Sequence, residues 1–158
     1  MANLNLKNKS ALVTGASGAI GESIAKKLYS LGANVIVTGT NKKKVMDLEK
    51  KLGSKSLGVV ADLCNDDDIN NLYSSSIKKF KSLDILVNNA GTNQDALSIR
   101  MTNKQWDEVI NVNLSATFKL SQLAIKSMIK KKWGRIIGIS SIIGIGGNIG
   151  QANYAASK

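Results

Sequence analysis

The sequence contains no histidine and a single cysteine, Cys64. Zinc sites are built mainly from histidine and cysteine ligands, so these residues cannot supply a zinc cluster. One cysteine also cannot form an intrachain disulfide, which is typical of a reducing compartment. The sequence has neither the pattern of a secretory signal nor an apolar run long enough to span a bilayer. We therefore expect a cytoplasmic protein with no metal and no membrane association.

Arginine is almost absent, since it occurs only at Arg100 and Arg135, and aromatic residues make up 4% of the chain. The formal net charge is nevertheless +11, because 22 lysine and arginine residues outnumber 11 acidic ones. Nucleic-acid-binding proteins share such a charge, but they use arginine forks to read guanine and aromatic rings to stack on bases. Because both are scarce, we expect no binding to nucleic acid and interpret the lysines mainly as solvated helix faces.

A glycine-rich segment, Gly15–Gly21, follows the short apolar run Ser10–Thr14. The run is typical of a buried strand, and apolar residues then recur at helical spacing until Gly32. A second apolar run, Asn34–Thr38, completes a unit of strand, glycine turn, helix and strand. Such a turn can bring backbone N–H groups and the positive end of a helix against a pyrophosphate. A loop with purely structural glycines is the alternative, and a Walker A loop is excluded because no Gly-Lys-Ser/Thr follows.

Apolar runs and helical periodicities alternate along the whole chain, which predicts one α/β domain over residues 1–158 with a parallel sheet and right-handed crossovers. The expected strands lie near residues 8–14, 34–39, 57–61, 84–88 and 135–140. The expected helices lie near residues 19–31, 42–52, 66–81 and 102–131, with another from about residue 152. Ligands of such sheets bind at the carboxyl ends of the strands, so we expect the site there.

The last five residues contain a tyrosine and a lysine, Tyr154 and Lys158, four positions apart. In a helix this spacing places both side chains on one face. A free phenol, with a pKa of about 10, is a reluctant proton donor at neutral pH. An ammonium group about 4 Å away favours the phenolate by roughly 4 kcal/mol at an effective dielectric near 20. The pair is therefore a candidate general acid, although the spacing alone is a weak motif that also arises by chance.

Five motifs in this order and spacing resemble those of the short-chain dehydrogenase/reductase family, and the resemblance covers the whole chain. The family's cofactor loop T-G-x-x-x-G-x-G matches Thr14–Gly21, except that Ala19 stands where the middle glycine is usual and Gly18 lies one place early. The T-G-x-x-G-x-x-G variant of the longer members fits equally well. The other motifs, which favour the short members, are Asn88–Gly91, Asn113-Leu114, Ser141, and Tyr154 with Lys158. The resemblance implies a Rossmann-type doubly wound parallel sheet with strand order 3-2-1-4-5.

The resemblance also implies an NAD(P)-dependent oxidoreductase that acts on CH–OH groups, with Asn113, Ser141, Tyr154 and Lys158 as catalytic residues. Tyr154 would be the acid/base, and Ser141 would bind the carbonyl oxygen of the substrate. Ser140 is the alternative to Ser141, which is preferred for its spacing to Tyr154. Lys158 would stabilise the phenolate and hold the nicotinamide ribose, and Asn113 would anchor a water that leads to Lys158.

The cofactor-binding residues that the resemblance implies lie mainly in the glycine loop and after the strands. They are Gly15, Ser17, Gly18, Ile20, Gly21, Thr40, Asp62, Leu63, Asn89, Ala90, Gly91, Tyr154 and Lys158. NAD specificity usually depends on an acid after the second strand, which binds the ribose 2′-OH. Gly39 takes that position here, followed by Thr40 and Lys42–Lys44, whose polar groups suit a 2′-phosphate. We therefore expect NADPH, with NADH less favoured, although these lysines could also simply solvate the start of a helix.

Segments 91–101 and 147–154 are similar to the 3-oxoacyl-[acyl-carrier-protein] reductases of bacterial fatty-acid synthesis. This similarity implies reduction of a 3-oxoacyl thioester to the 3-hydroxyacyl form with NADPH. The acidic acyl carrier protein would dock near Lys130–Lys132, although these lysines could equally complement the dipole of a helix. The alternative is another short-chain dehydrogenase, such as an acetoacetyl-CoA reductase or an alcohol, polyol or steroid dehydrogenase.

Members of this family continue well beyond the length of this chain. They carry the last two strands of the sheet, which are missing here, together with a substrate-covering loop and the surfaces that build a tetramer. We therefore expect this chain to be part of a longer reductase that forms a homotetramer when complete. A truncated product that binds a cofactor but does not catalyse is the alternative.

Overall fold

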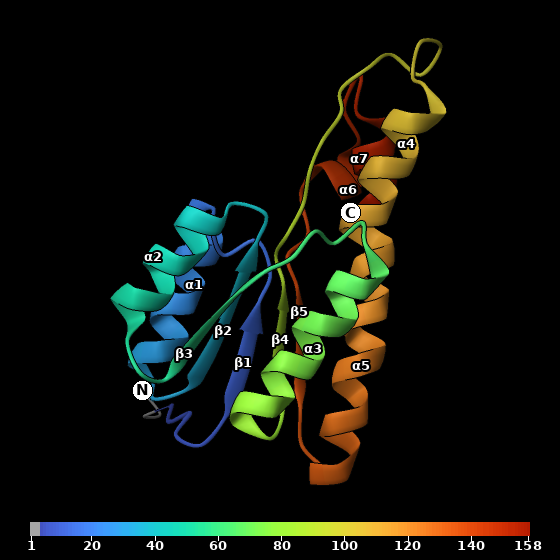
Figure 1. Ribbon diagram of the computed structural model, residues 1–158. Helices are drawn as coiled ribbons and strands as arrows, with labels where there is room; N and C mark the ends of the chain where they lie inside the picture. Colours follow the sequence, from blue (N-terminus) through green and yellow to red (C-terminus); the bar gives the residue numbers. More distant parts are fainter. Residues whose placement is uncertain (1–3) are drawn as a thin grey trace.

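Five parallel strands form one sheet in the computed structural model, which describes residues 4–158 (Figure 1). The strands are β1 (Ser10–Val13), β2 (Asn34–Gly39), β3 (Ser56–Val60), β4 (Ile85–Asn88) and β5 (Arg135–Gly138). Their order in the sheet is β3-β2-β1-β4-β5, and every neighbouring pair is parallel. The predicted α/β class and strand order are thus confirmed.

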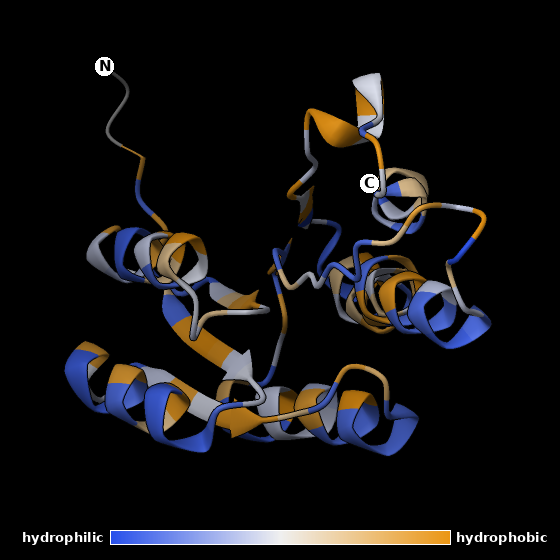
Figure 2. Ribbon diagram, turned by 90° about the horizontal axis from the view of Figure 1, so that it is seen from above, coloured by the Kyte–Doolittle hydropathy of each residue, from blue (hydrophilic) through white to orange (hydrophobic). Residues whose placement is uncertain are grey.

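Helices cover both faces of this sheet, and their apolar sides face it while their blue, hydrophilic sides lie outside (Figure 2). The helices are α1 (Ala19–Ser30), α2 (Lys42–Leu52), α3 (Asp66–Phe80), α4 (Asn103–Ile110), α5 (Ala116–Lys131), α6 (Ile143–Gly146) and α7 (Ala152–Ser157). A π-helical turn, η1 (Asn111–Ser115), joins α4 to α5. None of the helices within residues 4–158 combines the length and the apolar character needed to cross a membrane.

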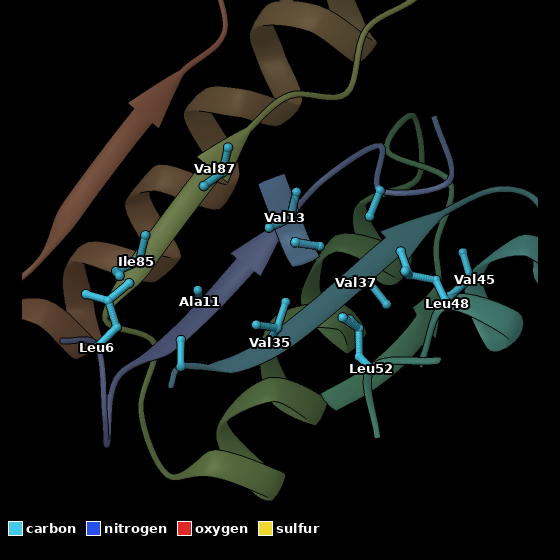
Figure 3. Packing of buried hydrophobic residues seen from close by; sticks show 13 residues of the cluster. Leu6, Ala11, Val13, Val35, Val37, Val45, Leu48, Leu52, Ile85 and Val87 are labelled. Carbon is cyan, nitrogen blue, oxygen red and sulfur yellow. The ribbon is translucent and has the colours of Figure 1, made fainter. Parts of the chain in front are cut away.

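Alternating side chains of the strands build two separate apolar layers. Val35 and Val37 of β2 pack with α1 and α2 on one face, whereas Ile36 packs with α3 and α5 on the other. Figure 3 shows the first of these layers, where Val45 and Leu48 of α2 reach the strands. Each fully buried aliphatic side chain contributes about 1.5–3 kcal/mol relative to exposure. Because the central strands are buried on both faces, they read as continuous apolar runs in the sequence.

The long helix predicted over residues 102–131 is continuous but contains one π-helical turn. Thr102 and Gln105 form a capping box at its start, and α4, η1 and α5 then follow one another without a break. In η1 the N–H of Ala116 bonds to the carbonyl of Asn111, five residues earlier, which widens the helix by one residue. Such π turns are rare and frequent at functional sites. The turn contains Asn113, one of the predicted catalytic residues.

Candidate active site

The glycine loop between β1 and α1 is shaped by close packing against the segment that follows β4. Gly15 has a φ of +62°, and a Cβ there would lie 2.8 Å from the Cα of Ala90. A Cβ on Gly21 would lie 2.4 Å from the carbonyl oxygen of Gly15. The hydroxyl of Thr14 accepts hydrogen bonds from the N–H groups of Asn89 and Ala90, at 3.0 and 2.9 Å. The glycine loop and the Asn89–Ala90 backbone are therefore one rigid unit.

Helix α1 begins at this loop without a side-chain cap. By contrast, Asn41 caps α2 and Asn65 caps α3, because their side-chain oxygens accept hydrogen bonds from N–H groups of the first turn. The first backbone bond of α1 runs from the N–H of Glu22 to the carbonyl of Gly18. A Cβ on Gly18 would meet nothing nearer than 3.5 Å, so the space beside the helix start is open. An uncapped helix N-terminus in open space is suited to bind an anion.

A cavity of about 860 Å³ opens at this point, at the carboxyl ends of β1 to β4. Its walls include every predicted cofactor-binding residue except Tyr154 and Lys158, namely Gly15, Ser17, Gly18, Ile20, Gly21, Thr40, Asp62, Leu63, Asn89, Ala90 and Gly91. Its volume suits an extended ligand of dinucleotide size. The shape, the open Gly18 and the uncapped helix fit a dinucleotide cofactor, and the role of each lining residue stays a prediction.

The cavity is lined by further residues that were not among the predicted cofactor-binding residues, although Ala19 and Gly39 belong to segments that the sequence marks. Its other lining residues are Ala19, Thr38, Gly39, Ala61, Cys64, Thr92, Glu108 and Val112. Thr38 and Ala61 end or follow strands, so the rule that ligands bind at strand ends could have found them. Glu108 and Val112 come from the helix that passes over the cavity, and no local pattern marks them. Burial raises the pKa of the Cys64 thiol, and the carboxylates of Asp62 and Glu108 add to this effect.

Lys158 reaches the edge of the cavity from the end of α7. Its Nζ donates a 2.9 Å hydrogen bond to the carbonyl oxygen of Ile139 and lies 3.4 Å from where a Cβ of Gly91 would be. The same Nζ lies 5.9 Å from the centre of the Tyr154 ring. Burial lowers the pKa of Lys158, because the charged form loses solvation. The structure thus brings the Tyr154–Lys158 pair and the cavity together at Gly91.

Asn113 joins the same region from the π turn. Its Oδ1 accepts a 2.8 Å hydrogen bond from the N–H of Thr92, and its Nδ2 donates to the Thr92 carbonyl at 2.9 Å and to the Ser157 hydroxyl at 2.8 Å. The side chain is therefore committed to the cavity wall on one side and to α7 on the other. Its predicted role as a water anchor stays a prediction.

The two adjacent serines after β5 differ in what they bond. Ser140 donates its hydroxyl to the carbonyl oxygen of Lys158 at 3.1 Å. Ser141 accepts a 3.2 Å hydrogen bond from the N–H of Ile143, and within residues 4–158 its own proton has no acceptor. The Ser141 hydroxyl can therefore donate a hydrogen bond to a ligand, and its predicted role toward the substrate stays a prediction.

No group of three or more histidine, cysteine, aspartate or glutamate side chains within residues 4–158 is arranged to hold a metal ion. The polar groups that meet at the cavity are hydroxyls, amides, one ammonium, backbone N–H groups, the carboxylates of Asp62 and Glu108 and the thiol of Cys64. This set can bind a phosphate-bearing ligand, donate hydrogen bonds to an oxygen and move a proton.

Comparisons with known proteins agree with this arrangement. A family model described as short chain dehydrogenase matches residues 9–158. The 3-oxoacyl-[acyl-carrier-protein] reductase FabG of Rickettsia typhi is 50% identical over 155 residues, which make up 98% of this chain and 63% of the relative. The proteins of that name from Aquifex aeolicus and Buchnera aphidicola subsp. Schizaphis graminum are 42% and 44% identical, over 98% of this chain and 64% of each relative. The chain thus spans slightly less than two thirds of the length of these relatives, and by the match of residues 9–158 it belongs to the short chain dehydrogenase family.

Proposed function

We propose that this chain is the cofactor-binding and catalytic part of an NADPH-dependent reductase of 3-oxoacyl thioesters carried on acyl carrier protein. The observation that carries the proposal is the position of the Lys158 ammonium, 3.4 Å from the Cβ position of Gly91, because it places the Tyr154 helix at the edge of the dinucleotide-sized cavity. The identity of 42–50% to reductases of that name supports the substrate class.

In this proposal NADPH, when bound, supplies the hydride that reduces the 3-oxo group. The residues of the chain handle the oxygen: Ser141 donates a hydrogen bond to it, and the Tyr154 hydroxyl donates the proton. Lys158 stabilises the phenolate that remains on Tyr154, and Asn113 holds α7 against the cavity wall through Ser157. A positioned general acid of this kind accelerates a reaction by about 10²- to 10⁴-fold. The preorganised donors add electrostatic stabilisation of the charge that develops on oxygen.

The end of β2 supports NADPH over NADH. No acid stands at Gly39 to bind the ribose 2′-OH, and a Cβ there would lie 2.6 Å from the Oγ of Ser17, so a side chain would have to displace that hydroxyl. Thr40 lines the cavity, and α2 begins two residues later with Lys42, Lys43 and Lys44. A hydroxyl and cationic side chains together suit a 2′-phosphate.

Exposed apolar side chains beside α7 are compatible with an acyl substrate. Ile142, Ile145 and Ile149 are 80%, 89% and 86% exposed, and α6, which carries one of them, packs against α7. Three such isoleucines on one short segment are costly in water unless they meet an apolar partner. In the proposed longer reductase, the further strands and the substrate-covering loop would cover part of this surface, and an acyl chain attached to the thioester would meet the rest.

Two of the three lysines at the end of α5 are candidates for the carrier site, because the third, Lys131, is engaged within the fold. Lys131 donates to the buried carboxylate of Asp84 at 3.0 Å and to the Ser82 hydroxyl at 2.6 Å, so it stabilises the fold. Lys130 and Lys132 remain for an acidic carrier. They lie at the amino-terminal edge of the sheet, separated from the cavity by the 16 residues of α5, or about 24 Å.

Activity assays of the intact gene product test this function directly. The protein should reduce acetoacetyl thioesters of acyl carrier protein, with NADPH preferred to NADH, and reduce the CoA thioester less efficiently. Turnover of the CoA thioester alone would identify an acetoacetyl-CoA reductase instead, and no turnover of any thioester would refute the acyl reductase.

A matched pair of variants tests the carrier site. Lys132→Glu should raise the KM for the carrier-bound substrate by about tenfold or more, which corresponds to about 1.4 kcal/mol, and leave the KM for the CoA thioester unchanged. Lys78→Glu, at the end of α3, is the control for the same charge change. Equal effects on both thioesters would contradict docking at Lys132.

A further inference from the structure

Asn153, the residue before Tyr154, has every polar atom of its buried side chain engaged. It is 0% exposed. Its Nδ2 donates to the carbonyl oxygens of Gln94 and Gln105, at 3.0 and 3.2 Å, and its Oδ1 accepts the N–H of Tyr154 at 2.8 Å. One amide thus joins three segments: the loop after β4, the first turn of α4 and the start of α7.

The backbone of Tyr154 is held on both sides of its Cα. Its N–H bonds to Asn153, and its carbonyl oxygen accepts a 2.9 Å hydrogen bond from the hydroxyl of Ser157. Helix α7 begins at Ala152 without a side-chain cap from Gln151. The orientation of its first turn therefore depends on contacts such as these. Asn153 supplies the contact at the end where Tyr154 begins.

The loop that Asn153 binds runs beside the segment before α7 (Figure 1). The N–H of Ala96 bonds to the carbonyl of Gly150 at 2.8 Å, and Gln151 donates to Asp95 at 3.1 Å. The first of these contacts is a single backbone bond, and the second joins exposed side chains. The bonds of Asn153 to the same loop come from a fully buried side chain. A buried amide with all its partners in place specifies one geometry more sharply than exposed contacts do.

We propose that Asn153 is a positioning residue for the reaction, which sets the placement of the Tyr154 hydroxyl through the backbone of Tyr154. The inference rests on the proposed function, because it needs Tyr154 to be the proton donor. Asn153 does not touch substrate or cofactor in this proposal. Loss of its bonds should therefore slow proton donation and leave cofactor binding almost unchanged.

Two variants of the intact gene product test the proposal. Asn153→Leu removes all three bonds at similar side-chain size, and Asn153→Asp keeps an acceptor for the Tyr154 N–H but loses both donors. Misplacement by about 1 Å can cost 10²-fold in rate, so we expect kcat per NADPH-binding site to fall by about that factor in Asn153→Leu, and by less in Asn153→Asp. The NADPH dissociation constant should change by less than about twofold, which corresponds to about 0.4 kcal/mol. The solvent deuterium isotope effect on kcat should rise, because proton transfer becomes slower.

A purely structural role predicts a different result. If Asn153 only stabilised the fold, its loss would lower the fraction of protein that binds NADPH but leave kcat per binding site and the solvent isotope effect unchanged. That outcome would overturn the proposal. Asn71→Leu, on the exposed face of α3, is the matched control and should keep wild-type turnover.

A spectroscopic measurement that does not depend on enzyme turnover can test the positioning role of Asn153 separately from the proposed function. With 3-fluorotyrosine incorporated, the ¹⁹F resonance of residue 154 can be assigned by its loss in Tyr154→Phe. We expect Asn153→Asp to shift or broaden this resonance and to leave those of Tyr29 and Tyr73 in place. If the wild type reduces no thioester but the resonance responds, only the proposed function fails. A wild-type resonance in both Asn153 variants would refute the positioning role.

Discussion

The ammonium nitrogen of Lys158 lies 5.9 Å from the centre of the Tyr154 ring and is held there by the backbone rather than by an acid. Its hydrogen bond goes to the carbonyl oxygen of Ile139, in the segment that follows β5. No carboxylate of the described residues forms a salt bridge with it. Its positive charge is therefore available to stabilise an anion on Tyr154.

Tyr154→Phe should abolish reduction by the intact gene product. The change removes the proposed proton donor and keeps the ring, so turnover should fall by about 10²-fold or more while the NADPH dissociation constant stays within about twofold. Tyr73→Phe, a similar deletion of a hydroxyl on α3, is the control. Near-normal turnover in Tyr154→Phe would mean that another group donates the proton.

Lys158 should make stability depend on pH in a defined direction. Burial lowers its pKa below 10.5 in the folded chain, so the folded chain binds this proton less tightly than the unfolded chain does. The unfolded state thus holds more protons between the lowered pKa and 10.5, and stability rises with pH across that interval. The free energy of unfolding of the wild type should rise relative to that of Lys158→Met across this interval. Urea titrations of both proteins at a series of pH values measure it, and a difference that falls with pH would contradict the sign.

Gly39→Asp should change cofactor preference. The carboxylate would repel a 2′-phosphate and displace the Ser17 hydroxyl, which lies 2.6 Å from the Cβ position. We expect the NADPH dissociation constant to rise at least about tenfold, or about 1.4 kcal/mol, with NADH affected much less. Gly39→Ala adds the same Cβ without the charge, so comparison of the two variants separates crowding from repulsion. Equal losses for NADPH and NADH in Gly39→Asp would show that crowding alone acts.

The sequence predicts the main elements of the fold because their signals are local. The predicted helix 42–52 coincides with α2, and the strand 34–39 coincides with β2. Each has a clear periodicity or a continuous apolar run, and Asn41 marks the start of α2. By contrast, α6 is a single turn of isoleucine and glycine, too short for any periodicity. The π turn η1 was also missed, because its five-residue bond pattern leaves no mark on side-chain spacing.

The residues of the candidate site also fall into two groups, those that local sequence signals predict and those that only the folded structure reveals. The glycine loop and the positions after β3 and β4 are found from sequence because parallel strands end at one edge of the sheet. Glu108 of α4 and Val112 of η1 line the cavity although they lie far along the chain from the strand ends, so they depend on tertiary packing. Asn153 was likewise missed as a site residue, since its partners Gln94 and Gln105 are 59 and 48 positions away in the chain. Contacts between residues so far apart in the chain can be identified only in the folded structure.

Two glycines of the cofactor loop should respond differently to the same added methyl group. Gly15→Ala places a side chain at a φ of +62° and 2.8 Å from the Cα of Ala90, so it should lower the free energy of unfolding by about 2 kcal/mol or more. Gly18→Ala has a φ of −93° and no atom nearer than 3.5 Å, so stability should stay the same or rise by about 0.4–1 kcal/mol. Its methyl group projects beside the uncapped start of α1, where the proposed pyrophosphate binds, and should weaken NADPH binding. Urea unfolding and NADPH titration of both variants test this separation. If Gly18→Ala binds NADPH as the wild type does, the pyrophosphate lies elsewhere in the cavity.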